Sequence, residues 1–141
     1  MYQFQRINKE NVYLVNDFLT VLGDGAESFR YFAKRPVDVV LAHVLTVVML
    51  DAQQSPVAYG HLDKEGADLW LGIAVAHKAQ GAGLGKKMLH YLIDYARTEG
   101  ETSITLTVDK HNTRAIRLYE ANNFVRIVAK DHYYQYLYEL E

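Results

Sequence analysis

The sequence predicts an α/β (α+β) domain in which helices flank a mixed β-sheet. The first observation is that the spacing of apolar residues switches repeatedly between the period of a helix and that of a strand. The second is the order of these segments, β-α-α-β-β-β-α-β-α-β-β, because interspersed helices and strands are typical of one α/β unit. The third is composition: 141 residues that are 50% hydrophobic and 23% charged suit one compact domain, here residues 1–141.

The chain is expected to begin with a short strand and two helices. Residues 2–7 fit a strand that ends at Asn8, which is a favourable N-cap for a helix over residues 10–22. Apolar residues recur in that segment at helical spacing. After a Gly-Asp-Gly break, residues 26–34 are predicted to form a second helix, which Pro36 stops.

The middle of the chain is expected to form three strands. Residues 39–50 are rich in β-branched and aliphatic side chains, and a polar turn separates them from a second strand at 57–62. The two segments are therefore predicted to form a hairpin. Residues 68–76 are apolar on both faces. We expect this third strand to be central in the sheet and covered by helices on both sides.

The last part of the chain alternates helices and strands. Residues 81–98 carry one apolar stripe, and Gly100 is the natural stop for that helix. The segments that follow are an alternating strand at 102–108, a short helix at 112–122, and a closing hairpin of strands at 124–129 and 133–140.

Charge and composition exclude several classes of function. The formal net charge of −2 gives no basic excess, so neither nucleic acid nor an anionic membrane is expected as a partner. The absence of cysteine excludes disulfides, thiolate catalysis and cysteine-ligated metal, and no metal site is expected. The longest apolar run, at 39–50, is too short to span a bilayer, and the N-terminal residues lack the pattern of a signal peptide. A cytoplasmic protein is therefore expected.

A glycine-rich segment, QGAGLGKK, lies between the apolar strand and the long helix. Glycines let backbone N–H groups approach an anion, and a helix N-terminus adds roughly half a positive charge, so phosphate or pyrophosphate is the expected guest. The segment is not a P-loop, because Gln80 and Lys87 stand where that loop needs a glycine and a hydroxyl. It is not a dinucleotide loop either, because Lys86 stands at the third glycine position. The alternative is a helix start softened by glycine with no ligand.

The spacing Q/R-x-x-G-x-G/A is satisfied by Gln80, Gly83 and Gly85. With the strand before it, LWLGIAVAHKAQGAGLGKKMLHYLID resembles the acetyl-CoA-binding motif of the GNAT superfamily of N-acetyltransferases. The resemblance implies the GNAT fold: a mixed sheet of about six to seven strands flanked by about four helices, with a splay between the strands at 68–76 and 102–109. It also implies acetyl-CoA as acyl donor. The residues expected to contact it are Ile73, Ala74, Val75, Gln80, Gly81, Ala82, Gly83, Leu84, Gly85, Lys86, Asn112 and Tyr119.

A second segment, VDKHNTRAIRLYEANNF, is similar to the other signature of that superfamily, N-x-x-A-x-x-x-Y-E-x-x-G-F. Asn123 stands in place of the usual glycine, and asparagine tolerates the left-handed conformation that ends a helix. The resemblance implies that Tyr119 protonates the departing thiolate, a role that suits a phenol. From the residues alone, Tyr119 could instead be a core aromatic. Asn112 could cap the helix, contact the pantetheine arm, or do both.

Several histidines are candidates for the general base, and water is the alternative. His61 is preferred because an imidazole titrates near neutral pH, although it could be an ordinary strand histidine. His43, inside a very apolar segment, is expected to be a satisfied core residue. The resemblance implies that a backbone N–H near Ile73 or Ala74 faces the thioester carbonyl. Gly72 beside them fits a bulge or the close approach of a ligand.

The resemblance implies an acceptor site between the first two helices and the final hairpin. Arg30 and Arg35 there could grip an anionic group, and Tyr31 and Tyr133 could stack on a ring. The expected function is transfer of the acetyl group of acetyl-CoA to a primary amine of a small molecule, such as an amino sugar. The alternatives are a protein N-terminal or lysine acetyltransferase and a non-catalytic acyl-CoA-binding sensor. A homodimer is a further expectation.

Overall fold

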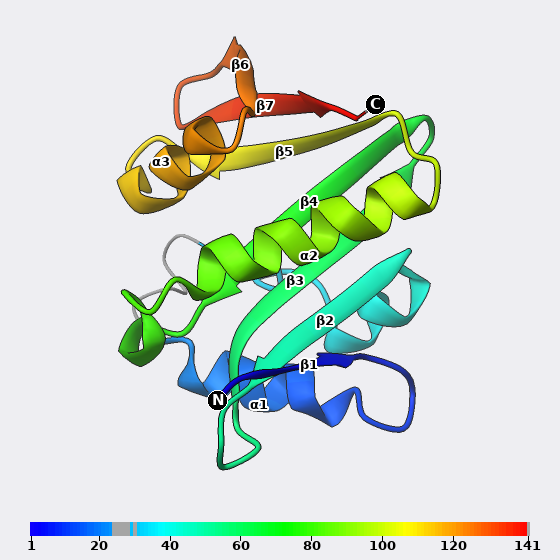
Figure 1. Cartoon of the computed structure of the whole chain (residues 1–141), viewed down its shortest axis with the longest axis vertical. Helices are drawn as coiled ribbons and strands as arrows, with labels where there is room; N and C mark the ends of the chain where they lie inside the picture. The colour runs from blue at the N-terminus through cyan, green and yellow to red at the C-terminus, as the bar shows by residue number, and fades with distance from the viewer. Residues whose placement is uncertain (24–28, 30, 141) are drawn as a thin grey trace.

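The computed structural model describes residues 1–23, 29 and 31–140, and a seven-stranded sheet runs through them in the order β1-β2-β3-β4-β5-β7-β6 (Figure 1). The predicted mixed sheet is confirmed, because β4 and β5 are parallel while the other neighbouring strands are antiparallel. The strands are β1 (Gln3–Arg6), β2 (Leu45–Leu50), β3 (Pro56–Glu65), β4 (Asp68–Val75), β5 (Ser103–Asp109), β6 (Val125–Ala129) and β7 (Tyr133–Glu139). The helices of the described residues are α1 (Tyr13–Val21), the 3-10 helices η2 (Val37–Ala42) and η3 (His77–Ala79), α2 (Leu84–Thr98) and α3 (Thr113–Ala121).

The strand predicted at 39–50 is wrong in its first part, where η2 stands and β2 begins only at Leu45. In η2, Val40 is buried and Val37 and Val39 are half-buried, whereas Asp38, Leu41 and Ala42 are exposed. The spacing of three between Val37 and Val40 matches one face of a helical turn and not the alternation of a strand. The β-branched residues of this segment therefore form one buried face of a short 3-10 helix and not a strand.

The N-terminal helices also differ from the prediction. Asn8 does not cap α1; its side chain accepts the N–H groups of Glu10 and Asn11, at 2.9 and 3.1 Å, and closes a turn before the helix. The helix predicted at 26–34 lies partly outside the described residues, and its described residues 31–34 form turns and bends. Residues 31–34 are therefore less regular than the predicted helix.

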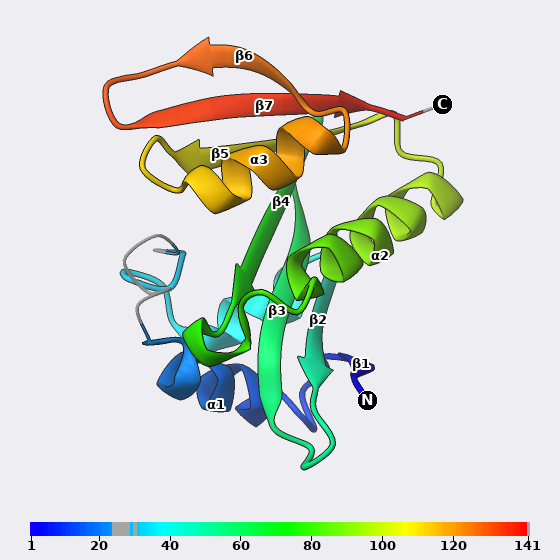
Figure 2. The ribbon, with the colours of Figure 1, turned by 60° about the vertical axis from the view of Figure 1, so that its left-hand side comes forward.

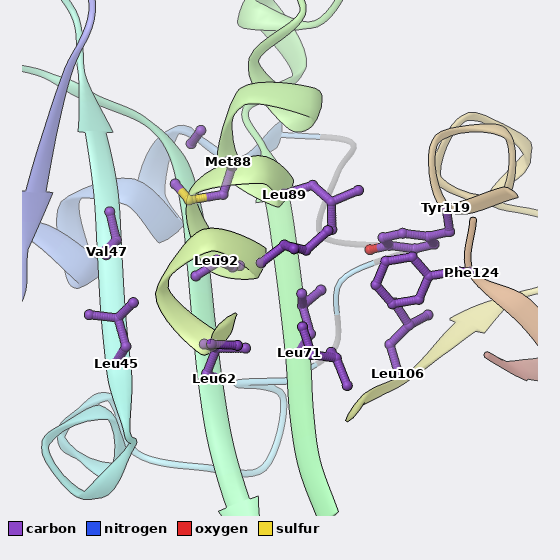
Figure 3. Packing of buried hydrophobic residues seen from close by; sticks show 14 of the residues in the cluster. Leu45, Val47, Leu62, Leu71, Met88, Leu89, Leu92, Leu106, Tyr119 and Phe124 are labelled. Atoms are coloured by element: carbon purple, nitrogen blue, oxygen red, sulfur yellow. The ribbon is translucent and has the colours of Figure 1, made fainter. Parts of the chain in front are cut away.

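Helices cover the two faces of the sheet at β2 and β3. α2 packs on one face, where Met88, Leu89 and Leu92 meet apolar side chains of the strands (Figure 3). α1 and η2 pack on the other face, around Phe18 and Tyr59. The two faces therefore contain two separate hydrophobic clusters. Of the site residues described below, Tyr119 belongs to the α2-side cluster, and Tyr59 belongs to the α1-side cluster.

Alternation along β3 decides which side chains reach that second face. Tyr59, His61 and Asp63 share it, since neighbouring residues of a strand point to opposite sides. Their partners across the antiparallel pairing with β4 are Ala74, Gly72 and Trp70, in that order.

A splay interrupts the middle of the sheet, as predicted. The pairing between β4 and β5 consists of Trp70 opposite Thr105, and from there the two strands diverge (Figure 2). β4 is central in strand order, but the expectation that helices cover both of its faces is wrong. Trp70 and Gly72 are only half-buried and line a cleft. The apolar character of β4 thus reflects a cleft wall as well as the core.

Candidate active site

Within the described chain, the backbone N–H groups of residues 81–85 at the start of α2 donate to no other residue, whereas the Gln80 N–H donates to the His77 carbonyl at 3.3 Å. Gly81 and Gly83 have φ angles of 91° and 78°, a region that strongly favours glycine. No side chain caps α2 at Gly83, and the first helical hydrogen bond runs from the Lys87 N–H to the Gly83 carbonyl at 3.2 Å. The N–H groups at such a helix start need an outside acceptor, and the helix dipole favours an anion there.

A cleft of about 470 Å³ lies between this turn, the end of β4 and the start of α3. The sequence-predicted cofactor residues that line it are Ile73, Ala74, Val75, Gln80, Gly81, Gly83, Leu84, Gly85, Lys86, Asn112 and Tyr119. Ala82 is the predicted residue that does not line it. Lys86 and Arg114 add positive charge to the wall, whereas the Lys87 ammonium lies 6.0 Å from the ring of Tyr2.

The turn fits a bulky anionic ligand. A Cβ added at Gly81 or at Gly83 would meet no atom within 4 Å, so the space beyond both glycines is open. Free amides, a cationic wall and this open space form the kind of cradle that binds phosphate or pyrophosphate.

The start and end of α3 match the second motif. The Asn112 side chain accepts the Ala115 N–H at 3.2 Å, so the capping role considered for it is present. Asn123 adopts a φ of 71°, which confirms that asparagine takes over the left-handed stop of the usual glycine. Glu120 accepts a hydrogen bond from the Tyr136 hydroxyl and also contacts Arg126, at 3.4 Å, so it ties α3 to the final hairpin.

Tyr119 places a buried hydroxyl at the inner end of the cleft. Its ring packs against Phe124 and Tyr136, and the residue is 5% exposed. Figure 3 shows the hydroxyl directed away from α3, toward the layer of α2 and β4. Within the described chain the hydroxyl has no hydrogen-bond partner, and burial raises the pKa of the phenol. The side chain therefore keeps its proton across the physiological pH range.

A second cleft, of about 530 Å³, continues from the first on the α1 side of the sheet. The two share Phe29, Ile73, Asn112 and Tyr119. Of the predicted acceptor residues, Tyr31 and Tyr133 line this second cleft, and Arg30 lies outside the described residues. The hydroxyl of Tyr119 is thus accessible from both clefts.

His61 lies in the wall of the second cleft, with its ring packed into the sheet. Its Nδ1 is 2.7 Å from the Tyr59 hydroxyl, and the ring of Tyr31 lies 4.5 Å away. Burial, with smaller effects of His43 and Arg35, lowers the pKa of His61 well below its ordinary value. The imidazole is therefore neutral at physiological pH, which differs from the expected titration near neutrality.

Gly72 has no bulge beside it, because the β3–β4 register is continuous through Gly72. A Cβ at Gly72 would instead lie 2.6 Å from His61 Cε1. This glycine provides the room for the imidazole ring, a requirement that the neighbouring sequence does not reveal.

His43 has partners on both ring nitrogens, as expected of a satisfied histidine. Its Nε2 is 2.6 Å from the Tyr31 hydroxyl, and its Nδ1 is 2.9 Å from Thr46 Oγ1. It lies after η2, however, and not inside a strand. The ring of His43 is 4.5 Å from that of His61, so the histidines and Tyr31 form one packed group.

Sequence reasoning missed several residues of the second cleft. These are Asp63 and Glu65 on β3, Trp70 on β4 and Asp109 on β5. Arg35, which was expected to grip an anionic group, lines the cleft as well. The available signal was the alternation in AYGHLDKE, which puts the histidine and both carboxylates on one face once the segment is recognised as a single strand.

The described residues offer neither a cluster for a metal ion nor a helix that spans a membrane. They contain no group of three or more His, Asp or Glu side chains that could hold a metal ion. None of their helices has both the length and the apolar character needed to cross a membrane.

Comparison with known sequences identifies relatives of part of the chain. Mycothiol acetyltransferase of Renibacterium salmoninarum is 44% identical over 54 residues, which are 38% of this chain and 16% of that protein. The [ribosomal protein bS18]-alanine N-acetyltransferase of Salmonella typhimurium is 39% identical over 62 residues, 44% of this chain and 42% of that protein. The chain therefore aligns with less than half the length of these curated relatives.

Solved structures share the fold over the whole chain. The GNAT domain of S. lividans PAT has a TM-score of 0.86 at 15% identity, covering 99% of this chain and 90% of that one. The structure of yncA from Salmonella typhimurium with its cofactor acetyl-CoA has a TM-score of 0.78 at 18% identity, covering 100% and 95%. The model of the acetyltransferase (GNAT) family matches residues 13–124, which is most of the sequence. The chain belongs to the acetyltransferase (GNAT) family.

Proposed function

We propose that this protein transfers the acetyl group of acetyl-CoA to a primary amine of a small molecule. The observation that carries the proposal is the junction of the two clefts at Ile73, Asn112 and Tyr119. A donor in the first cleft and an acceptor in the second would meet beside the buried hydroxyl of Tyr119. Binding two reactants in a fixed geometry is itself a large part of catalysis.

The first cleft is proposed to hold acetyl-CoA, which supplies an activated acetyl thioester when it is bound. Backbone N–H groups of residues 81–85, including Ala82, bind the pyrophosphate together with Lys86. Ile73, Ala74 and Val75 on the splayed end of β4 contact the pantetheine arm through their backbone groups. Asn112 contacts it from the start of α3.

Tyr119 is proposed to be the general acid. Its raised pKa keeps the proton on Oη in the resting site. Burial also raises the basicity of a thiolate that departs beside it, so Oη is placed to give the sulfur its proton. The lack of a competing hydrogen bond in the described chain leaves the hydroxyl ready to donate.

His61 is proposed to accept the proton that the amine releases. Burial keeps the imidazole neutral, so a lone pair is available. If Nδ1 carries the hydrogen and donates it to the Tyr59 oxygen, Nε2 is left as the acceptor. An imidazole of lowered pKa is a weak base, but a nitrogen that is forming a bond to carbon becomes acidic enough for it.

The second cleft is proposed to bind the acceptor, with Tyr31, Tyr133 and Arg30 as contacts. Its volume of about 530 Å³ lies within the range of small-molecule sites, which favours a metabolite such as an amino sugar or another amine. A protein N-terminal or lysine acetyltransferase is the second candidate, and the relative named for ribosomal protein bS18-alanine favours it. A panel of amines and of alanine-ended peptides would separate the two.

The variant Tyr119→Phe tests the proposed chemistry. We expect kcat to fall by about 10²-fold while the Kd for acetyl-CoA is unchanged, because only the proton donor is lost. Tyr138→Phe is the matched control, since Tyr138 stacks on Phe124 from outside the two clefts. Equal turnover in the two variants would remove Tyr119 from the mechanism. Acetyl-CoA binding without turnover of any amine by the wild type would instead support a non-catalytic sensor.

We further propose that the protein acts in the cytoplasm as a homodimer. β6 is an edge strand, and its Val125 and Ile127 are 62% and 49% exposed, which is unusual for an edge left uncovered. Light scattering of the wild type and of Val125→Lys tests the dimer: a monomeric wild type would exclude it.

A further inference from the structure

Carboxylates gather on one face of the β3–β4 hairpin, next to the proposed reaction site. Asp63 and Glu65 follow His61 on the same face of β3 and line the second cleft. Glu65 lies directly opposite Asp68 on β4. Like charges in directly opposed positions destabilise a sheet, so this arrangement has a cost that needs a compensating reason.

The neighbouring cations do not neutralise this face. Lys64 points to the opposite face and pairs with Glu101, at 2.8 Å. The Arg35 guanidinium lies 4.3 Å from the Tyr31 ring centre and donates to the Tyr31 carbonyl at 2.9 Å. Neither Asp63 nor Glu65 forms an ion pair or a side-chain hydrogen bond with any described residue. Their negative charge is therefore available to a ligand.

Aromatic rings stand beside these carboxylates. Trp70 is half-buried, lies opposite Asp63 across the strand pair and lines the same cleft, as does Tyr133. The face of an indole ring attracts cations, and a carboxylate next to it strengthens that attraction. Together they form a site that suits an ammonium group.

An independent observation marks this cleft as a ligand site. The Tyr119 side chain is 5% exposed, and its hydroxyl lines the same cleft without a partner in the described chain. Because no buried side-chain oxygen of the described residues lacks a partner, the Tyr119 oxygen reaches the cleft and can bind a ligand or solvent there. The cleft thus has a polar inner end at Tyr119 and an anionic outer end at Asp63.

We propose that the acceptor is an amine that carries a second positive charge, which Asp63, Glu65 and Trp70 bind while the first amine reacts. This inference rests on the proposed acetyl transfer and names its substrate class. His61 and Asp63 are two residues apart on β3, a span of roughly 7 Å. An extended chain of about six bonds covers that distance, which is the separation of the two nitrogens in cadaverine.

The second charge takes no part in the bond changes. The N–C bond to the acetyl carbon forms as the C–S bond breaks, one proton leaves the reacting nitrogen for His61, and the Tyr119 proton goes to sulfur. The distal ammonium remains intact and serves only for binding, so its removal should change kcat/KM chiefly through KM.

Three acceptors of similar length test the proposal in the presence of acetyl-CoA: cadaverine, pentylamine and aminovalerate. We expect kcat/KM for cadaverine to exceed that for pentylamine by at least about fivefold, with aminovalerate, whose distal group is anionic, below both. Asp63→Asn should reduce the cadaverine preference toward one, because the distal ammonium then loses the carboxylate that distinguishes it from a methyl group. Asp94→Asn, an exposed carboxylate on α2 outside the cleft, is the matched control and should keep the preference.

Calorimetry of cadaverine binding to the wild type and to Asp63→Asn separates this inference from the proposed function. Turnover of all three acceptors with equal kcat/KM would overturn the inference and leave acetyl transfer standing. If no amine were acetylated, the proposed acetyl transfer would be wrong. Weaker cadaverine binding by Asp63→Asn would then still support a site for an ammonium group at Asp63. Equal binding by the two proteins would overturn it.

Discussion

The two clefts that meet at Tyr119 are built from different kinds of chemical group. The first cleft, proposed for acetyl-CoA, presents mainly backbone amides at the start of α2, from the consecutive residues 81–85. The second cleft, proposed for the acceptor, presents side chains on alternate positions of β3 and β4, with Tyr31 and Tyr133 from distant segments. A backbone site can be recognised from a short motif, whereas a side-chain site depends on strand register. The difference explains why one half of the site is visible in the sequence and the other is not.

The largest effect is expected from a charge in the backbone cradle. Gly83→Asp adds a carboxylate and a side chain at a φ of 78°, so the affinity for acetyl-CoA should fall more than about 10²-fold. Gly100→Asp is the control, because Gly100 has a φ of 80° and open space around it at the other end of α2. Calorimetry with acetyl-CoA gives the result. Equal losses in both variants would mean that backbone strain, and not the anion site, explains the effect.

The second prediction compares alanine variants of two glycines, Gly72 and Gly60, whose added Cβ atoms would lie on opposite faces of the sheet. A Cβ at Gly72 would press on the His61 ring, and one at Gly60 would press on Met88 Sδ, both at 2.6 Å. Each alanine variant should lose about 1–3 kcal/mol of stability. Gly72→Ala should also lower kcat/KM about tenfold for any amine, because the imidazole must move. Gly60→Ala should keep its turnover; a loss there equal to that of Gly72→Ala would argue against a separate acceptor face.

The third prediction concerns acid stability of the acceptor side. Burial lowers the pKa of both His43 and His61. Since the unfolded chain then binds protons more readily, stability is fully present above pH about 6.5 and falls as pH drops below it, by up to about 1.4 kcal/mol per pH unit for each histidine. Urea unfolding in buffers about one pH unit apart, between about pH 7.5 and 5, measures this change in the free energy of unfolding. His61→Gln should flatten the dependence, and the exposed His90→Gln should not.

The smallest effect is expected at the junction of the clefts. Asn112→Ala removes the cap of α3 and should cost about 1 kcal/mol of stability, whereas Asn112→Asp keeps the cap. Any further loss of acetyl-CoA affinity in the aspartate variant would come from its charge near the cofactor. Thermal unfolding and calorimetry together separate the two contributions. If both variants lost only stability, Asn112 would be a cap and nothing more.

Much of the fold could be predicted because its signals are local. The apolar stripe of α2, the alternation of β5 and the motif that ends at Phe124 each describe one contiguous element. The errors fell where tertiary packing overrides local preference. Residues 39–42 have the composition of a strand but bury only one edge, as a 3-10 helix does.

The candidate site divides in the same way. Residues 80–86 and the second motif are near one another in the chain, and their geometry follows from glycine dihedrals and helix caps. The environment of His61 does not: its neighbours Tyr31, Tyr59 and Gly72 come from three segments. A histidine in an apolar stretch can be an exposed base or a buried neutral ring, and only its packing decides its pKa.

By itself, the sequence determined the mixed α/β organisation, the glycine cradle at the start of α2 and the position of Tyr119 on α3, because each depends on residues close in the chain. The tertiary structure alone decided that the two clefts meet at Tyr119, that His61 is buried and neutral, and that Asp63 and Trp70 face the same space. The physical reason is that side-chain proximity across a sheet depends on strand pairing and register, and a shift of one residue would send every one of these groups to the opposite face.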